Sequence, residues 1–180
     1  MRYAERDEAH REHFRHAIDA LQASGRAVYF LDESGIDHRL HRPYARAARG
    51  ETVFTDVPGA RRQRTSIISA SQGHRLVAPM VFTGHCNRAV VDAYFKHLLL
   101  PSLPKGSVIV LDNASFHRSP GTRTLVEAAG CSLLFLPAYS PDLNPIEHVW
   151  ATLKKLLQKK LHTIKRKDSF IMKTCLLLCA

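Results

Sequence analysis

The chain has 180 residues, 45% of them hydrophobic, and its 26 lysines and arginines against 16 acidic residues give a formal net charge of +10. This length is typical of one domain that buries a core without disulfides or structural metals, and the composition excludes collagen-like and wholly disordered chains. Four cysteines without a CxxC pair argue against a zinc ribbon or a disulfide scaffold and fit a reducing intracellular compartment. The charged N-terminus and the short apolar runs predict neither a secretory signal nor a membrane span. A pI near 9.8 suggests a polyanionic partner, with nucleic acid the first candidate, although a solvated basic face explains the charge equally well.

The N-terminal half of the sequence predicts one helix followed by strands. Phe14, Ile18 and Leu21 recur at helical spacing, which predicts an amphipathic helix that ends at Gly25. Apolar runs bounded by turn residues then predict strands, and the last two runs are close enough to form a hairpin. The expected strands are residues 27–31, 65–70 and 76–82, with a possible short strand at 39–41 and a loop at 58–59.

The C-terminal half alternates helices and strands. Asn87 is a suitable helix cap, and the apolar positions that follow it repeat every three to four residues as far as Pro101. Residues 108–111 are apolar throughout, as in a central strand that is covered on both faces. The later expected elements are a helix at 122–129, a strand at 132–136, a loop at 137–145 and a helix at 146–161. This order predicts a mixed sheet flanked by helices.

Two aspartates each follow an apolar run directly. If the strands before Asp32 and Asp112 are parallel neighbours, their ends lie about 4.8 Å apart. Two carboxylates so close repel each other unless a cation neutralises them, and oxygen ligands suit Mg²⁺ or Mn²⁺ better than zinc. Either aspartate alone is also explained as a turn former at the end of a strand.

A third acid, Glu147, stands at the start of the expected last helix. Asn144 fits the N-cap, Pro145 the first helical position and Glu147 the third, so the glutamate could simply complete a capping arrangement. The helix dipole would equally keep Glu147 ionised and ready to bind a metal. On the same helix, Trp150 belongs to the apolar stripe and is assigned to the core, whereas Lys154 could meet a phosphate or simply face solvent.

Three segments together resemble a known family. They are Leu31-Asp32-Glu33-Ser34-Gly35, Val110-Leu111-Asp112-Asn113-Ala114-Ser115-Phe116-His117 and Tyr139-Ser140-Pro141-Asp142-Leu143-Asn144-Pro145-Ile146-Glu147-His148-Val149-Trp150. They resemble the mariner-type DDE transposases of bacterial insertion sequences, with 34 residues between Asp112 and Glu147, and the resemblance covers roughly residues 26–162.

The resemblance implies an α/β, RNase H-like (retroviral-integrase-like) fold with a mixed five-stranded sheet. It implies that Asp32, Asp112 and Glu147 are catalytic and bind two Mg²⁺ ions, for which Mn²⁺ can substitute. The expected activity is metal-dependent DNA cleavage and strand transfer in the transposition of an insertion sequence. Asn113, His117 and Asn144 stand beside the acids, where a role in orienting ligands or substrate is plausible, although a structural hydrogen bond explains His117 as well.

The same resemblance sets the expected organisation and partners. We expect an N-terminal linker helix at 1–25, the catalytic domain at 26–162, and a C-terminal tail at 163–180 that could be truncated. The expected partners are double-stranded DNA (transposon ends and a TA target) and a second copy in a homodimer, in a cytoplasmic, nucleoid-associated bacterial protein. Candidate DNA contacts, for each of which a solvated surface residue is an equal alternative, are Arg61, Arg62, Arg64, Lys154 and Lys155.

Two alternatives to an active transposase remain open on the sequence. Complete members of the family carry an N-terminal helix-turn-helix region, and only one helix precedes the first strand here. The chain could therefore be a catalytically inactive DNA-binding remnant or regulator. A general RNase H-like nuclease would use the same metal chemistry without the specific third segment.

Overall fold

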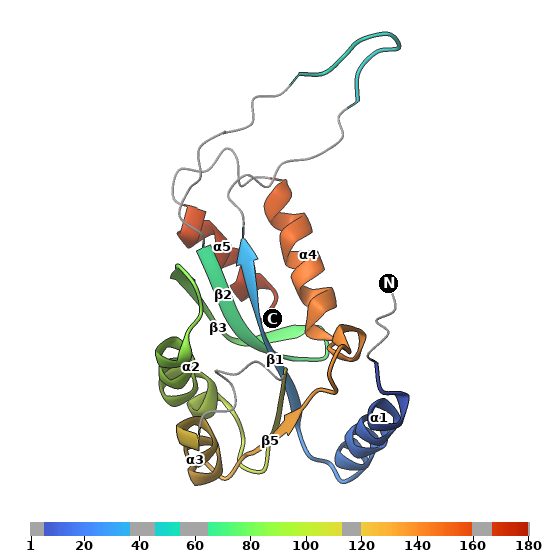
Figure 1. The fold of residues 1–180 in the computed structure, drawn as a ribbon. Helices are drawn as coiled ribbons and strands as arrows, with labels where there is room; N and C mark the ends of the chain where they lie inside the picture. Colours follow the sequence, from blue (N-terminus) through green and yellow to red (C-terminus); the bar gives the residue numbers. More distant parts are fainter. Residues whose placement is uncertain (1–5, 37–45, 55–64, 113–119, 160–166, 180) are drawn as a thin grey trace.

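The computed structural model describes residues 6–36, 46–54, 65–112, 120–159 and 167–179, and its centre is a five-stranded sheet (Figure 1). The strands are β1 (Val28–Ile36), β2 (Thr65–Gln72), β3 (Arg75–Thr83), β4 (Val108–Leu111) and β5 (Ser132–Phe135). The helices are α1 (Glu8–Ala23), α2 (Arg88–Tyr94), α3 (Pro120–Ala128), α4 (Ile146–Gln158) and α5 (Lys167–Leu177). Single turns η1 (Phe95–Leu99) and η2 (Leu100–Ser102) extend α2, and η4 (Pro141–Leu143) precedes α4.

The sheet is mixed, in the order β3-β2-β1-β4-β5. Strands β1, β2 and β3 pair antiparallel, whereas β4 and β5 run parallel to β1. The hairpin between β2 and β3 turns at Gly73, whose φ of 58° lies in the region that favours glycine. The predicted hairpin of the second and third strands and the predicted mixed sheet are confirmed.

Strand β1 is longer than its apolar run predicts. The sequence suggests that the strand stops at Leu31, but it continues to Ile36. Its second half pairs with β2, from Asp32 opposite Ser69 to Ile36 opposite Thr65. Ladder hydrogen bonds to a neighbouring strand thus outweigh the turn preference of the residues after Leu31. Asp32 therefore lies within a strand and not behind one.

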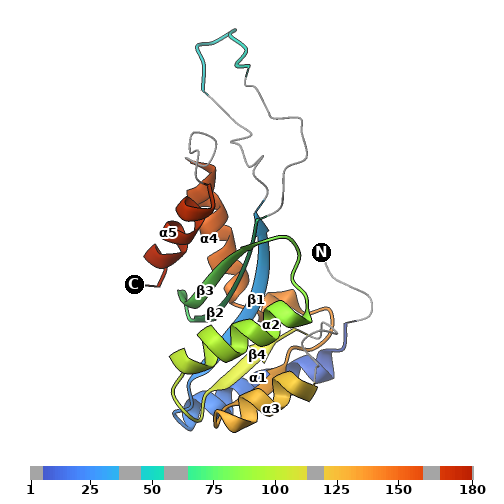
Figure 2. The same ribbon diagram turned by 90° about the vertical axis from the view of Figure 1, so that its left-hand side faces the viewer.

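Helices cover both faces of the sheet (Figures 1 and 2). One face packs against α1, α4 and α5, and the other against α2, η1 and α3. Strand β4 shows the two-sided burial that was predicted for it, because Val108 and Val110 enter the first cluster while Ile109 and Leu111 enter the second.

The C-terminal segment forms a helix that belongs to the core. Ile171 and Cys175 of α5 are fully buried against the face that α1 and α4 cover. Beyond α5, the carbonyl oxygen of Leu178 accepts a hydrogen bond from the backbone N–H of Leu76 at 2.8 Å. The sequence predicts only a tail here, because α5 shows no amphipathic period that would mark it.

Two sequence expectations fall outside the described residues, namely the short strand at 39–41 and the loop at 58–59. Among the helices that the structure describes, none is both long and apolar enough to cross a membrane.

Candidate metal centre

Two of the three predicted acids lie on neighbouring strands. Strands β1 and β4 are adjacent and parallel, with Phe30 opposite Val110. Two residues further along each chain stand Asp32 and Asp112, so the register brings these aspartates next to each other. The condition under which the two aspartates would lie close together, that their strands are parallel neighbours, is therefore met. Because β4 ends at Leu111, Asp112 is exposed, while Asp32 stays half-buried within β1.

The carboxyl group of Asp32 has an unusual environment. Burial raises its pKa from the ordinary value of 3.8 to about 7, and the negative charges of Glu147 and Asp112 add to this rise. The hydrogen bonds that it accepts from the backbone N–H of Glu33 and from Trp150 act in the opposite direction. Asp32 therefore senses both other acids, which reach it from β4 and from α4.

Trp150 contributes more than core packing to this region. Its side chain is only 1% exposed, and its indole Nε1 donates a hydrogen bond to Oδ2 of Asp32 at 3.1 Å. The assignment of Trp150 to the core is correct, but the contact with Asp32 was not foreseen. A signal was available, because a buried indole N–H needs an acceptor and Trp150 lies one helical turn after Glu147.

The start of α4 does not use the predicted side-chain cap. The N-cap position is Pro145, without a side-chain hydrogen bond, so Asn144 does not cap the helix. Asn144 is instead 6% exposed, and its Oδ1 is buried without a hydrogen-bond partner in the described structure. The capping interpretation is therefore wrong for Asn144, because η4 directs its side chain into the protein and not over the helix end. Glu147 is exposed in the first turn of α4.

The loop before α4 is anchored by an ion pair to α1. The guanidinium of Arg11 makes two hydrogen bonds to the carboxylate of Asp142, at 3.1 and 2.7 Å, and its Nε lies 3.3 Å from Glu8. Arg6 also lies 2.9 Å from Oδ2 of Asp142, the oxygen that accepts the shorter hydrogen bond from Arg11. The Arg11 side chain is 1% exposed, whereas that of Asp142 is 53% exposed. The paired arginines lower the pKa of Asp142, with the Arg11 hydrogen bond as the largest cause.

The remaining predicted site residues divide into two groups. Lys154 is half-buried and Lys155 exposed, both on α4. Five predicted residues lie outside the described part of the chain: Arg61, Arg62, Arg64, Asn113 and His117. Within the described ranges, no three His, Cys, Asp or Glu side chains are gathered closely enough to hold a metal ion. The acids are thus close enough to influence one another, but they do not form a closed cage.

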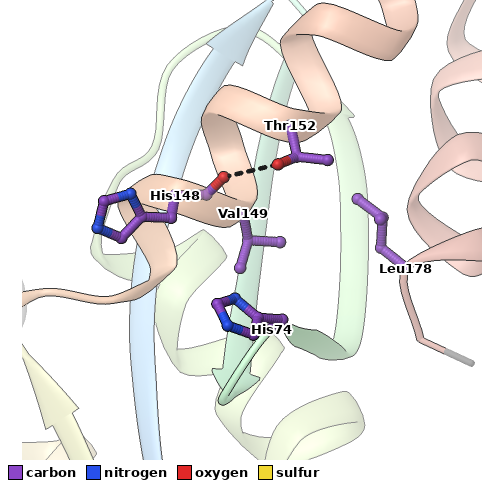
Figure 3. A pocket seen from close by; sticks show the side chains of 5 residues that line it. All are labelled: His74, His148, Val149, Thr152 and Leu178. Carbon is purple, nitrogen blue, oxygen red and sulfur yellow. Dashed lines mark hydrogen bonds between the residues drawn. The ribbon is translucent and has the colours of Figure 1, made fainter.

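A separate pocket of about 490 Å³ lies on another side of α4, and Figure 3 shows its lining. Among the described residues it is lined by His74, His148, Val149, Thr152 and Leu178. The hydroxyl of Thr152 donates to the backbone oxygen of His148 at 3.0 Å. None of the three acids is among these lining residues, so the pocket is distinct from the acidic region.

Comparison with known proteins agrees with this geometry. Residues 27–171 match the family described as DDE superfamily endonuclease. A curated relative is the transposase of the transposable element Tc3 from Caenorhabditis elegans. It is 46% identical over 46 residues, which are 26% of this chain and 14% of that protein. The chain spans less than two thirds of the length of the curated relatives that it matches.

Solved structures share the fold. The Mos1 transposase catalytic domain, solved with raltegravir and Mg, matches with a TM-score of 0.66 and 16% identity, over 100% of this chain and 85% of that one. The catalytic core domain of BIV integrase matches with a TM-score of 0.53 and 10% identity, over 84% of this chain and 82% of that one. Other matching Mos1 structures include paired-end complexes, one with a left transposon end, one with Mg and one with Mn. The expected RNase H-like, integrase-like fold is confirmed, and the chain belongs to the DDE superfamily endonuclease family.

Proposed function

We propose that this chain carries the catalytic centre of a DNA transposase, which cleaves DNA at transposon ends and transfers the strands into a target. One observation carries the proposal: β1, β4 and α4 bring Asp32, Asp112 and Glu147 within electrostatic reach of one another. These are the three acids that the sequence motifs single out. Family membership and the fold of the Mos1 catalytic domain support the same activity.

The donor set fits a hard divalent cation. All three side chains offer carboxylate oxygens, which Mg²⁺ and Mn²⁺ prefer. Their mutual repulsion contributes to the raised pKa of Asp32, and a bound cation would relieve it. The buried Oδ1 of Asn144, which lacks a partner in the described structure, is a further oxygen close in sequence to Glu147. We propose that Asp32, Asp112 and Glu147 hold two Mg²⁺ ions, with Mn²⁺ as a substitute.

The residues of the proposed metal centre have different roles. Metal ions bound here would lower the pKa of an attacking hydroxyl and stabilise the leaving oxygen of a phosphodiester. The half-buried Asp32 is the fixed member of the set, because Glu33 and Trp150 hold its carboxylate. Asp112 and Glu147 are exposed and face the solvent from which DNA must approach. Asn113 and His117 are proposed to orient ligands or substrate from the segment after Asp112.

The proposed partners are DNA and a second copy of the chain. The net charge of +10 supports binding to the phosphate backbone, and Lys154 and Lys155 extend along α4 from Glu147. Arg61, Arg62 and Arg64 are proposed as further phosphate contacts. Mos1 transposase is found in paired-end complexes, which supports a homodimer on paired transposon ends. A TA target and association with the nucleoid complete the proposal.

The test combines metal binding with catalysis. Wild type and Asp112→Ala are melted with and without Mn²⁺, and then incubated with end-containing and target DNA. At 100 times its dissociation constant, Mn²⁺ should stabilise the wild type by about 2.7 kcal/mol and the variant far less. Asp112→Ala should also lose metal-dependent cleavage while keeping non-specific DNA binding, because the basic surface is unchanged.

Other outcomes contradict the proposal. Equal cleavage by Asp112→Ala, or no Mn²⁺ stabilisation of the wild type, would overturn it. Cleavage without strand-transfer products would instead indicate a nuclease. Binding to DNA with no cleavage at all would indicate a non-catalytic remnant.

A further inference from the structure

The side chain of Trp150 has two neighbours of different kinds. Its ring is part of the apolar cluster under α4, and it is 1% exposed. Its one polar atom, the indole Nε1, donates to Oδ2 of Asp32 at 3.1 Å. The same carboxylate accepts a second hydrogen bond, from the backbone N–H of Glu33, and it lies within electrostatic reach of Glu147 and Asp112. A core residue thus supplies one of the hydrogen bonds that hold the carboxylate of Asp32.

The hydrogen bond also connects two elements that carry acids. Asp32 belongs to β1, whereas Trp150 lies on α4 three residues after Glu147, which is almost one helical turn. A rotation or slide of α4 that moved Glu147 would also pull Trp150 away from Asp32. The single bond therefore couples the placement of Glu147 on its helix to the carboxylate of Asp32 on the sheet.

Neighbouring donors do not duplicate this constraint. The backbone N–H of Glu33 also donates a hydrogen bond to the Asp32 carboxylate. Because Glu33 and Asp32 both belong to β1, this bond does not fix the position of Asp32 relative to α4. The Arg11–Asp142 ion pair joins α1 to η4, the turn before α4, and does not contact Asp32. Of these contacts, only the one from Trp150 joins an acid of the sheet to the helix of Glu147.

We propose that Trp150 is a positioning residue of the metal centre, and that its indole N–H fixes Asp32 relative to Glu147. This inference rests on the proposed function, since it assumes that the two acids share a cation. Groups that orient metal ligands in this way change metal affinity by roughly 10-fold to 100-fold when they are removed. The ring itself is required for packing, so the test must remove the N–H and keep the ring.

The sequence makes such a test possible, because Trp150 is the only tryptophan of the chain. Global replacement of tryptophan by 3-benzothienylalanine changes this one residue, exchanging the ring N–H for sulfur at nearly constant shape. Trp150→Phe is the genetic counterpart, with a smaller ring. Mn²⁺ binding is measured by titration calorimetry, and folding by circular dichroism and thermal melting.

A matched control removes another buried hydrogen bond of an aromatic residue. The hydroxyl of Tyr94, which is fully buried on the opposite face of the sheet, accepts a hydrogen bond from the backbone N–H of Ala70 at 3.1 Å. Tyr94→Phe should lower the melting temperature and leave the Mn²⁺ dissociation constant within about twofold of wild type. Any loss of affinity that merely follows lost stability would appear in this control as well.

We expect the benzothienylalanine protein and Trp150→Phe to be folded and to bind Mn²⁺ about tenfold more weakly than wild type. Wild-type affinity in the folded benzothienylalanine protein would overturn the inference, while the loss in Asp112→Ala would keep the proposed function standing. A wild type that binds no Mn²⁺ would overturn both. If Trp150→Phe does not fold, the benzothienylalanine protein decides alone.

Discussion

Two aspartates of this chain, Asp32 and Asp142, have pKa values that move in opposite directions. Asp32 is half-buried, and burial together with two neighbouring acids raises its pKa to about 7. Asp142 is 53% exposed, and the buried guanidinium of Arg11 lowers its pKa. The first site lacks a compensating cation among the described side chains, and the second contains one. The contrast separates an acid suited to an external cation from an acid that anchors a loop.

The largest effect on stability is expected when the carboxylate of Asp142 is removed. Asp142→Ala leaves the guanidinium of Arg11 buried, with Glu8 as its remaining acidic partner. Removing one partner of a buried ion pair is strongly destabilising, and we expect a loss of about 2–3 kcal/mol in the free energy of unfolding, measured with urea. This loss is below the roughly 3–5 kcal/mol that is typical of fully buried ion pairs, because the side chain of Asp142 is half-exposed.

An exposed ion pair provides the control for Asp142. Arg123 and Glu127 lie 3.9 Å apart on α3, each 62% exposed. Glu127→Ala should change stability by less than about 0.5 kcal/mol. Equal effects of the two substitutions would contradict the importance of burial at Arg11.

The next effect has the opposite sign and concerns Asp32. Asp32→Asn removes the cost of ionising a half-buried carboxyl whose pKa is raised from 3.8 to about 7, a cost of roughly 4 kcal/mol at most. Because the amide must still be buried, we expect the metal-free protein to gain about 2 kcal/mol of stability at pH 8. As pH rises from about 4 to about 7, the unfolded wild type ionises at Asp32 before the folded protein does. Wild-type stability should therefore fall over this range and level off above it, and the gain from Asp32→Asn should disappear near pH 4.

Melting temperatures in chelator between pH 4 and pH 8 measure this gain. Asp19→Asn, at an exposed position of α1, is the matched substitution and should have little effect. A pH-independent gain in Asp32→Asn would indicate altered packing and not a relieved charge.

The smallest effect is the pH dependence that the Asp142 ion pair gives to stability in acid. Because the folded pKa of Asp142 is lowered, its contribution to stability is present above about pH 4 and is lost as pH falls through the folded pKa. Wild type should therefore lose stability in acid more steeply than Asp142→Asn, as followed by urea unfolding between pH 2.5 and pH 5. If the stability of the two proteins fell equally with pH, the pKa of Asp142 would not differ between the folded and unfolded states.

The sequence predicts the elements of the sheet and the three acids better than the contacts between them. Apolar runs identify β2, β3, β4 and β5 nearly to the residue, because burial determines both pattern and strand. The length of β1 could not be predicted, since its second half is held by pairing with β2, a long-range contact. For the same reason α5 could not be predicted, because its burial depends on elements far away in the sequence.

Within the candidate site, local patterns were misleading at two residues. The cap geometry expected for Asn144 fits every local preference, but the turn before α4 directs its side chain inward. Trp150 was correctly assigned to the core from its position in the apolar stripe, and this assignment hid its polar atom. Burial of an aromatic ring and a role beside a carboxylate are compatible, because the indole has one apolar body and one donor.

The arrangement of the two helical faces has a consequence for the order of folding. The face of α2, η1 and α3 comes from one continuous stretch of chain, whereas the face of α1, α4 and α5 combines both ends of the sequence. During synthesis the ribosome releases the N-terminal segments first. Helices α2 and α3 and the turn η1 can therefore pack on β1, β2 and β4 before α4 has been synthesised. Glu147 and Trp150 arrive late, so a nascent chain would have most of its sheet before it acquires the complete set of acids.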